Sequence, residues 1–363
     1  MTNRRPGGRM QELRAVAIRL ALVFCAIGLA GVAVPGVVLA LAPAVAAEPD
    51  CRRTEFTATR VPLVVSTPAR VSGELCAAPR DRVVHLLVPG ATYNSSYWDF
   101  PYQPERYSYV RAMRAAGIAT FRLDRLGTGE SNRPASVEMS LLSHAEVVRQ
   151  LVPALRTGLI GGQSFEKVVI VGHSFGTLVT YAAVGSEPDL VDGVIATGVS
   201  RGPDLPGLFE ILVTFTHPAR LEGGRFAGMD PGYLTTVPGQ RGDFYHRPAI
   251  DPQVVAVDEA TKDVQSATDL GTIALPLLST LNFRKPVLNV MGDDDLVFCQ
   301  LIPCSSPLSP WNAERLLFPQ VPSYDSLIVP STGHNINLHP NAHLFFEKAI
   351  EWTRTHFPEQ LTG

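Results

Sequence analysis

The chain has 363 residues, of which 45% are hydrophobic, 18% charged and 8% aromatic. This length and composition predict one large globular domain or two ordinary ones, and they exclude a disordered protein, a coiled coil and a collagen-like chain. Lys and Arg number 31 and Asp and Glu 34, so the formal net charge of −3 offers no basic surface for nucleic acid.

The first 47 residues have the pattern of an export signal. Five arginines precede an uncharged run from Leu20 to Ala47, which ends in the small residues Ala44-Val45-Ala46-Ala47. A basic start, an apolar middle and an Ala-rich exit are typical of a signal peptide that is removed on secretion. A retained membrane anchor is the alternative, because the run is long enough to span a bilayer. Pro35 and Pro43 interrupt it and favour cleavage, so we expect a secreted protein.

The predicted mature chain, residues 48–363, contains 26 basic and 33 acidic residues and carries a formal charge of −7. Such a surface favours solubility and repels nucleic acid and anionic membranes, so neither is an expected partner. Four cysteines remain in it, and they allow three pairings. We expect Cys51–Cys76 and Cys299–Cys304, because each pair closes a loop within one local unit. Four free thiols, the alternative, are unusual in an exported protein.

Short β-rich runs alternate with helical stretches from residue 61 to residue 357. Most of the predicted strands are continuous apolar runs, which is typical of strands buried on both faces of a parallel sheet. The predicted strands are Val61–Val65, Val71–Cys76, Val83–Val88, Ala119–Leu123, Lys167–Val171, Gly193–Thr197, Pro286–Val290 and Ser326–Val329. The predicted helices are Tyr109–Ala116, Ser143–Thr157, Thr177–Val184 and Asn341–Phe357.

This alternation predicts right-handed βαβ crossovers and an α/β fold with a doubly wound, mostly parallel sheet. The first two strands are spaced as an antiparallel hairpin at its edge. One segment, about residues 201–278, breaks the alternation: it has many Gly and Pro residues, scattered aromatics and no clear strand. Because it follows one central strand and precedes the next, we expect it to lie as a lid above the carboxyl ends of the strands, where ligands bind.

The most informative motif is Gly172-His173-Ser174-Phe175-Gly176, which separates a predicted strand from a predicted helix. The string is short, and its weight comes from this context. A strand-to-helix turn this tight strains its central residue, and the two glycines give it room. Such a turn exposes the Ser174 hydroxyl beside the positive end of a helix. We interpret His173 as a packing residue.

A nucleophilic serine needs a base, and the base needs an orienting acid. The run Asp293-Asp294-Asp295 follows one predicted strand, and His334 follows the last one. Both positions lie at carboxyl ends of strands, so both groups can converge on Ser174. Adjacent side chains of an extended segment point in opposite directions, so Asp294 faces away from the group that Asp295 faces. Asp293 lies further from the sheet edge, which favours Asp295.

From about Val61 to Phe357 the chain resembles an α/β-hydrolase of the lid-bearing serine hydrolase type, similar to esterases and lipases. The resemblance rests on the Ser174 turn, the G-x-x-D turn that ends at Asp295, Gly333-His334, and the order Ser, Asp, His. It implies Ser174 as nucleophile, Asp295 as acid and His334 as base. It also matches the loop at 124–131, which we interpret as structural. A dinucleotide site there would need a third glycine where Asn132 stands.

The resemblance further implies an oxyanion hole made of two backbone N–H groups. One belongs to Phe175, the residue after the nucleophile. The other comes from the loop Pro89-Gly90-Ala91-Thr92-Tyr93, where many relatives have His-Gly in place of Pro-Gly. Ala91 is the expected donor, and Thr92 takes its place if the register shifts by one residue.

The resemblance therefore implies a secreted serine hydrolase that cleaves small or lipid-like carboxylic esters through an acyl-enzyme intermediate. A peptidase or amidase of the same fold is one alternative, and a non-catalytic binding module is another. A dehalogenase or an epoxide hydrolase would need an aspartate at position 174. We expect no cofactor and no metal ion, since His339 and His343 have no third ligand nearby in the sequence.

Overall fold

The computed structural model describes residues 51–59, 68–201, 214–276, 278–299 and 302–361. By its internal contacts the chain divides into two units, Met1–Ala47 and Glu48–Gly363, and every described residue belongs to the second. The predicted leader and the predicted strand Val61–Val65 lie outside the described residues. Within those residues, no helix is both long enough and apolar enough to cross a bilayer.

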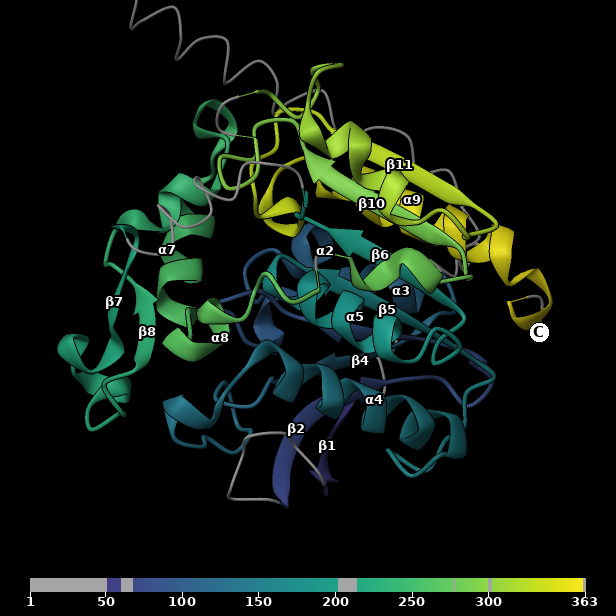
Figure 1. Ribbon diagram of the computed structural model, residues 1–363, viewed down its shortest axis with the longest axis horizontal. Helices are drawn as coiled ribbons and strands as arrows, with labels where there is room; N and C mark the ends of the chain where they lie inside the picture. The colour runs from purple at the N-terminus through teal and green to yellow at the C-terminus, as the bar shows by residue number, and fades with distance from the viewer. Residues whose placement is uncertain (1–50, 60–67, 202–213, 277, 300–301, 362–363) are drawn as a thin grey trace, which may run out of the picture. The chain divides into compact units, whose positions relative to one another are not determined.

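A mostly parallel sheet of eight strands forms the centre of the second unit (Figure 1). The strand order is β1-β2-β4-β3-β5-β6-β10-β11, and only the β1–β2 and β2–β4 pairs are antiparallel. The strands are β1 (Cys51–Ala58), β2 (Ala69–Cys76), β3 (Val83–Val88), β4 (Ala119–Leu123), β5 (Lys167–His173), β6 (Gly193–Thr197), β10 (Val287–Gly292) and β11 (Tyr324–Val329). The predicted doubly wound, mostly parallel α/β sheet is confirmed.

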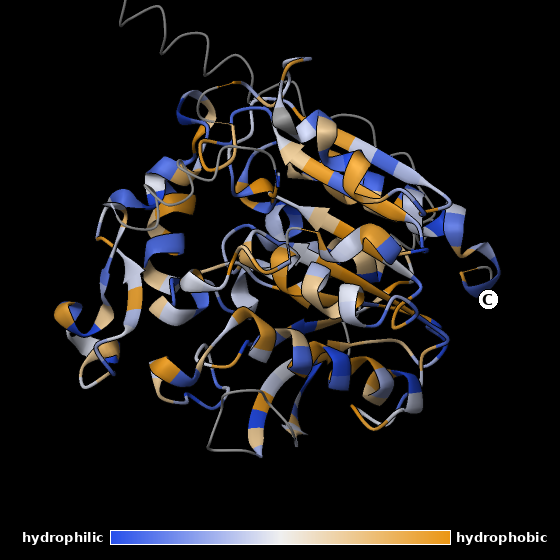
Figure 2. Cartoon of the chain, in the orientation of Figure 1, coloured by the Kyte–Doolittle hydropathy of each residue, from blue (hydrophilic) through white to orange (hydrophobic). Residues whose placement is uncertain are grey.

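Apolar residues of alternating direction build a core on each face of this sheet. In β5, Val168 and Ile170 belong to one buried cluster, and Val169 and Val171 belong to the other. This is why the strand is a continuous apolar run in the sequence. Figure 2 shows the central strands coloured mainly as hydrophobic.

Helices cover both faces of the sheet. Buried residues of α4 (Leu141–Thr157) and α5 (Phe175–Ser186) join one cluster, and those of α3 (Tyr109–Ala115) and α9 (Ala342–His356) join the other. The Ser140 side chain caps α4 by accepting the Ser143 N–H, and Gly158 ends it in a left-handed conformation. The four predicted helices agree with these to within two residues at each end. A short helix, α2 (Pro104–Tyr107), precedes α3.

The edge hairpin is present, and its first strand is Cys51–Ala58, a segment that the sequence did not predict as a strand. Most of β1 is exposed or half-buried and carries Arg52, Arg53 and Glu55, so it lacks the apolar run by which strands were sought. Cys51 lies directly opposite Cys76 in the ladder, and the two form a disulfide. The structure also contains the disulfide Cys299–Cys304.

The segment between β6 and β10 has a small sheet of its own, which corrects the expectation of no strand there. Its strands are β7 (Thr216–Pro218), β8 (Tyr233–Thr236) and β9 (Gln265–Ser266), accompanied by α7 (Pro252–Thr261) and α8 (Ala267–Gly271). Strands of two to four residues are too short to show an alternating pattern in a sequence. We refer to residues 214–276 as the cap.

Candidate active site

Ser174 occupies a one-residue turn between β5 and α5. Its backbone has φ 52° and ψ −120°, a conformation that costs a residue with a side chain about 1–3 kcal/mol. Two hydrogen bonds hold it there: the Ser174 N–H donates to the Thr197 carbonyl at 2.9 Å, and its own carbonyl accepts the Thr177 N–H at 2.8 Å. The strained turn that the motif predicts is therefore present.

The two glycines of the motif are required by close backbone contacts. A Cβ atom at Gly172 would lie 2.6 Å from the Thr177 Cα atom, and one at Gly176 would lie 2.2 Å from the Val88 carbonyl oxygen. No side chain fits at either distance. The first glycine thus lets the chain reverse into α5, and the second lets α5 pack against the end of β3.

His334 and Asp295 meet beside this turn. The His334 Nδ1 atom lies 2.9 Å from Asp295 Oδ2, and both side chains are buried. The other carboxylate oxygen, Oδ1, accepts the backbone N–H groups of Val297 and Phe298 at 2.9 and 3.2 Å. A carboxylate held by these donors fixes the imidazole, and donation from Nδ1 leaves Nε2 as the proton acceptor. Ser174 and His334 line the same cavity.

Each of the three consecutive aspartates has a different partner. Asp293 accepts the backbone N–H of Thr332 at 3.0 Å, and the Asp294 carboxylate lies 2.7 Å from the His246 Nδ1 atom of the cap. Of the three, only Asp295 contacts His334 in the part of the chain that the structure describes. The sequence argument that separated Asp294 from Asp295 agrees with this arrangement.

The loop after β3 passes directly beside the serine. A Cβ atom at Gly90 would lie 3.2 Å from the Ser174 Cβ atom, and both Ala91 and Thr92 line the cavity. Among the described residues, neither the Ala91 nor the Phe175 backbone N–H donates a hydrogen bond to another protein group. Both expected donors are therefore free to bind a ligand oxygen.

Residues 86–343, more than two thirds of the chain, match the model of the alpha/beta hydrolase family. The chain belongs to this family. The resemblance that its motifs indicated is thereby confirmed. A comparison with curated protein sequences gives no match for this α/β-hydrolase.

Solved structures of the same fold include several proteins named for ester cleavage. A thermophilic esterase from Thermogutta terrifontis has 19% identity and a TM-score of 0.54, over 84% of this chain and 99% of that one. A monoacylglycerol lipase from Paleococcus ferrophilus has 18% and 0.55, over 79% and 99%. A putative lipase from Acinetobacter baumannii has 13% and 0.57, over 85% and 93%. At these identities the likeness shows the fold.

Arg125 anchors the loop after β3 in this α/β-hydrolase, a role that the sequence did not indicate. Its buried guanidinium donates to the carbonyls of Pro89 and Gly90 at 3.1 and 2.8 Å, and it lies 5.0 Å from the centre of the Phe175 ring. Burial lowers the pKa of Arg125 to about 10, which leaves it charged at neutral pH. It follows Asp124 in the loop interpreted as structural, and this contact gives that loop a structural role.

His173 packs behind the predicted base. Its ring stacks on Tyr97 at 4.3 Å and lies 4.9 Å from the His334 ring. Burial, and then the neighbouring His334, hold the pKa of His173 well below its ordinary value. The side chain is therefore a neutral packing group, as the sequence predicts.

A buried ion pair in the cap reaches the loop after β3. Arg241 donates from Nη2 to Asp258 Oδ1 at 2.5 Å and from Nη1 to Thr92 Oγ1 at 2.9 Å. The guanidinium also lies 4.0 Å from the centre of the Tyr93 ring. Arg241 and Asp258 are both buried. Isolated charged residues give no motif, so nothing in the sequence pointed to this pair.

The same carboxylate reaches the loop that holds His334. The second oxygen of Asp258 accepts the Tyr93 and Tyr245 hydroxyls at 3.1 and 2.8 Å and the Asn335 side-chain amide at 3.3 Å. Asn335 is the residue after His334. One buried carboxylate of the cap therefore binds both the loop after β3 and the His334 loop.

His339 also joins the cap to the His334 loop. Its Nε2 atom accepts the backbone N–H groups of His246 and Gly333 at 2.9 and 3.0 Å, and its Nδ1–H donates to the Asn335 carbonyl at 2.8 Å. Burial lowers the pKa of His339 to about 4, so it is neutral at pH 7. Neither ring nitrogen is left for a metal ion, and His343 is exposed.

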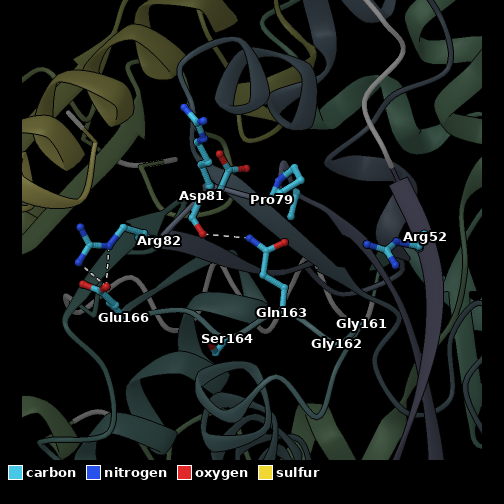
Figure 3. A pocket seen from close by; sticks show the side chains of 11 residues that line it. Arg52, Pro79, Asp81, Arg82, Gly161, Gly162, Gln163, Ser164 and Glu166 are labelled. Atoms are coloured by element: carbon cyan, nitrogen blue, oxygen red, sulfur yellow. Dashed lines mark hydrogen bonds and ion pairs between the residues drawn. The ribbon is translucent and has the colours of Figure 1, made fainter. Parts of the chain in front are cut away.

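A larger cavity, of about 900 Å³, has none of these groups among its described lining residues (Figure 3). It is lined by Arg82 and Glu166, which precede β3 and β5, whereas Ser174 follows β5. Figure 3 shows Arg82 and Glu166 pointing toward each other, and they form an ion pair. Gln163 donates to the Asp81 carbonyl at 3.0 Å across the same cavity. These contacts join chain segments at the amino ends of the strands, away from the candidate site.

Proposed function

We propose that this α/β-hydrolase cleaves carboxylic esters by acyl transfer, with Ser174 as nucleophile, His334 as base and Asp295 as the orienting acid. The observation that carries the proposal is the shared cavity: a serine on a strained turn faces the same space as a histidine whose other nitrogen is held by a buried carboxylate. The esterase and lipase names of several structural neighbours support an ester substrate.

In the proposed first step, His334 Nε2 takes the Ser174 hydroxyl proton as the oxygen attacks the ester carbonyl carbon. The carbonyl oxygen becomes an anion, which the N–H groups of Ala91 and Phe175 bind. Removing one donor of this kind from a studied protease costs about 10²–10³ in kcat. The imidazolium then protonates the departing alcohol, and a water molecule releases the acid from Ser174 by the same two proton transfers.

A purely binding role is disfavoured by the strain at Ser174. A positive φ at a residue with a side chain persists only where the surrounding structure enforces it, and such residues cluster at active sites. Here two glycines and two hydrogen bonds enforce it. A binding module has no need of that conformation, nor of two N–H groups beside the serine that bind no other described group.

We also propose that the enzyme is exported and acts outside the cytoplasm. The leader pattern at residues 1–47 and the two disulfides support this, because disulfides persist in oxidising compartments.

Labelling with a fluorophosphonate probe and hydrolysis of nitrophenyl esters test the proposal. Ser174→Ala should lose about 10⁶-fold in kcat, as the loss of a triad serine does in a studied protease, and should no longer be labelled. Ser164→Ala is the matched control, since Ser164 is exposed and lines the larger cavity. Near-normal esterase activity in Ser174→Ala would refute the proposal, and faster cleavage of peptide anilides than of esters would make the enzyme an amidase.

A further inference from the structure

The cavity beside Ser174 is small. Its volume is about 50 Å³. Pockets that bind drug-sized ligands usually measure about 300–1,000 Å³, so this cavity accommodates only a small group. Once the alcohol has departed, the acyl group is still bonded to the serine, and it is therefore the part of the substrate that this space must enclose.

The walls of the cavity are mainly apolar. Ala91 and Val297 come from loops at the sheet edge, Tyr93 contributes its ring, and Phe215 and Phe244 come from the cap. None of the described residues that line it is Asp, Glu, Lys or Arg, and His334 is the one histidine among them. Arg241 lies behind this wall, buried and paired with Asp258. Among the described residues, this lining therefore offers no Lys or Arg side chain to an acidic acyl chain.

Phe244 closes the cavity on the cap side. Its ring centre lies 5.9 Å from the His334 ring centre, and its carbonyl accepts the Asn335 N–H at 3.1 Å. The Arg241 guanidinium lies 5.7 Å from the Phe244 ring. The backbone hydrogen bond and the neighbouring guanidinium thus hold this wall against the His334 loop.

We propose that the enzyme is specific for esters of short, uncharged acyl groups of about two to four carbons, and that Phe244 sets this limit. The inference rests on the proposed function and names its substrate class. An acyl chain of eight carbons is too large for a cavity of this volume. In enclosed pockets one methylene changes kcat/KM by about 10–200-fold, so the discrimination should be large.

The test measures kcat/KM for nitrophenyl acetate, butyrate and octanoate, which share one leaving group. The wild-type enzyme should prefer acetate or butyrate to octanoate by at least about 10-fold. Phe244→Ala should raise the octanoate-to-acetate ratio by about 10-fold or more, and Phe244→Leu should raise it less. Leu221→Ala, an exposed cap residue, is the control and should leave the ratio unchanged.

The wild-type profile is decisive even where the alanine variant does not fold. Octanoate cleaved as fast as acetate in a Ser174-dependent reaction would overturn the acyl limit and leave the proposed function standing. An unchanged octanoate-to-acetate ratio in a folded Phe244→Ala variant would show that Phe244 does not set the acyl limit. If Ser174→Ala cleaves all three esters as well as the wild type does, the proposed function and the acyl limit both fail.

Discussion

The central sheet and the cap are stabilised by different kinds of contact. In the sheet, every residue of β3 and β10 is buried, most of them are apolar, and their side chains fill the two cores. In the cap, the buried apolar cluster consists of Ala219, Phe226, Tyr233 and Val264. Much of what the cap buries is charged or polar instead, including Arg241, Asp258, Lys262, Asp263 and Asp269.

This difference sets how each region responds to substitution. Apolar contacts in the sheet are numerous and individually small, so trimming one methyl group costs little. A buried charge that loses its partner keeps its full desolvation cost. A single substitution should therefore loosen the cap. Because the Arg241–Asp258 pair contacts both loops of the candidate site, we expect that substitution to lower activity as well.

The largest expected effect concerns the aspartates that follow β10. Asp295 contacts His334 of the candidate site, whereas Asp294 contacts His246 of the cap. Asp295→Asn should lower kcat by about 10⁴-fold, since an amide holds the imidazole in the wrong tautomer. Asp294→Asn breaks only the contact with His246, and Asp293→Asn keeps an oxygen for the Thr332 N–H, so both should retain most activity. Steady-state kinetics of the three variants decide the matter, and equal losses would contradict the assignment.

Removal of the buried Arg241 guanidinium from the cap is the next largest effect. Arg241→Met should lower the free energy of unfolding by about 3–5 kcal/mol, because Asp258 then stays buried and unpaired. In the sheet, Ile170→Val should cost only about 0.5–1.5 kcal/mol. Urea denaturation of both variants measures the contrast.

The double variant Arg241→Met with Asp258→Leu is the control for this prediction. It removes both charges and should recover part of the lost stability. A loss for Arg241→Met no larger than that for Ile170→Val would show that the cap does not depend on the ion pair.

Acid should weaken the sheet through a buried histidine. His85 of β3 lies between the Tyr109 and Thr353 hydroxyls, and burial lowers its pKa from 6.5 to about 3. Between these values the unfolded chain binds a proton that the folded chain does not, so stability is complete above pH 6.5 and is lost as the pH falls toward 3. The loss reaches at most about 1.4 kcal/mol per pH unit for one histidine.

Urea denaturation at pH 7, 6 and 5 tests this expectation. His85→Gln should flatten the fall in stability relative to the wild type. His339, whose pKa of about 4 is also lowered by burial, should contribute in the same direction from the junction of cap and sheet. If stability falls with pH in parallel for the wild type and His85→Gln, His85 does not contribute to the acid sensitivity.

The disulfide between Cys299 and Cys304 gives the smallest effect. Cys299 and Cys304 are five residues apart, and a loop this short should contribute about 2 kcal/mol or less to stability. The Cys299 N–H, however, donates to the Asp295 carbonyl at 2.8 Å. Replacing both cysteines by serine should therefore reduce turnover more than the melting temperature. The same change at Cys51 and Cys76, in the edge hairpin, should do the reverse, and equal effects on turnover would contradict this.

The sequence alone determined the central sheet and the residues that gather at its edge. Strands buried on both faces must be apolar throughout, so their runs are visible without a structure. Carboxyl ends of parallel strands share one edge, and for this reason Ser174, Asp295 and His334 could be brought together from their positions after strands. Cysteine spacing likewise predicted both disulfides. The export signal at residues 1–47 stays a prediction.

Only the tertiary structure decided the cap, the first edge strand and the anchors of the loop after β3. Arg241 and Thr92 are 149 positions apart, and Arg125 lies 36 positions from the Pro89 carbonyl that it binds. β1 is half-exposed and charged, and the cap strands have two to four residues. Periodicity reveals only those segments whose burial repeats along the chain. A single arginine, buried because a carboxylate from another segment meets it in space, leaves no such repeat.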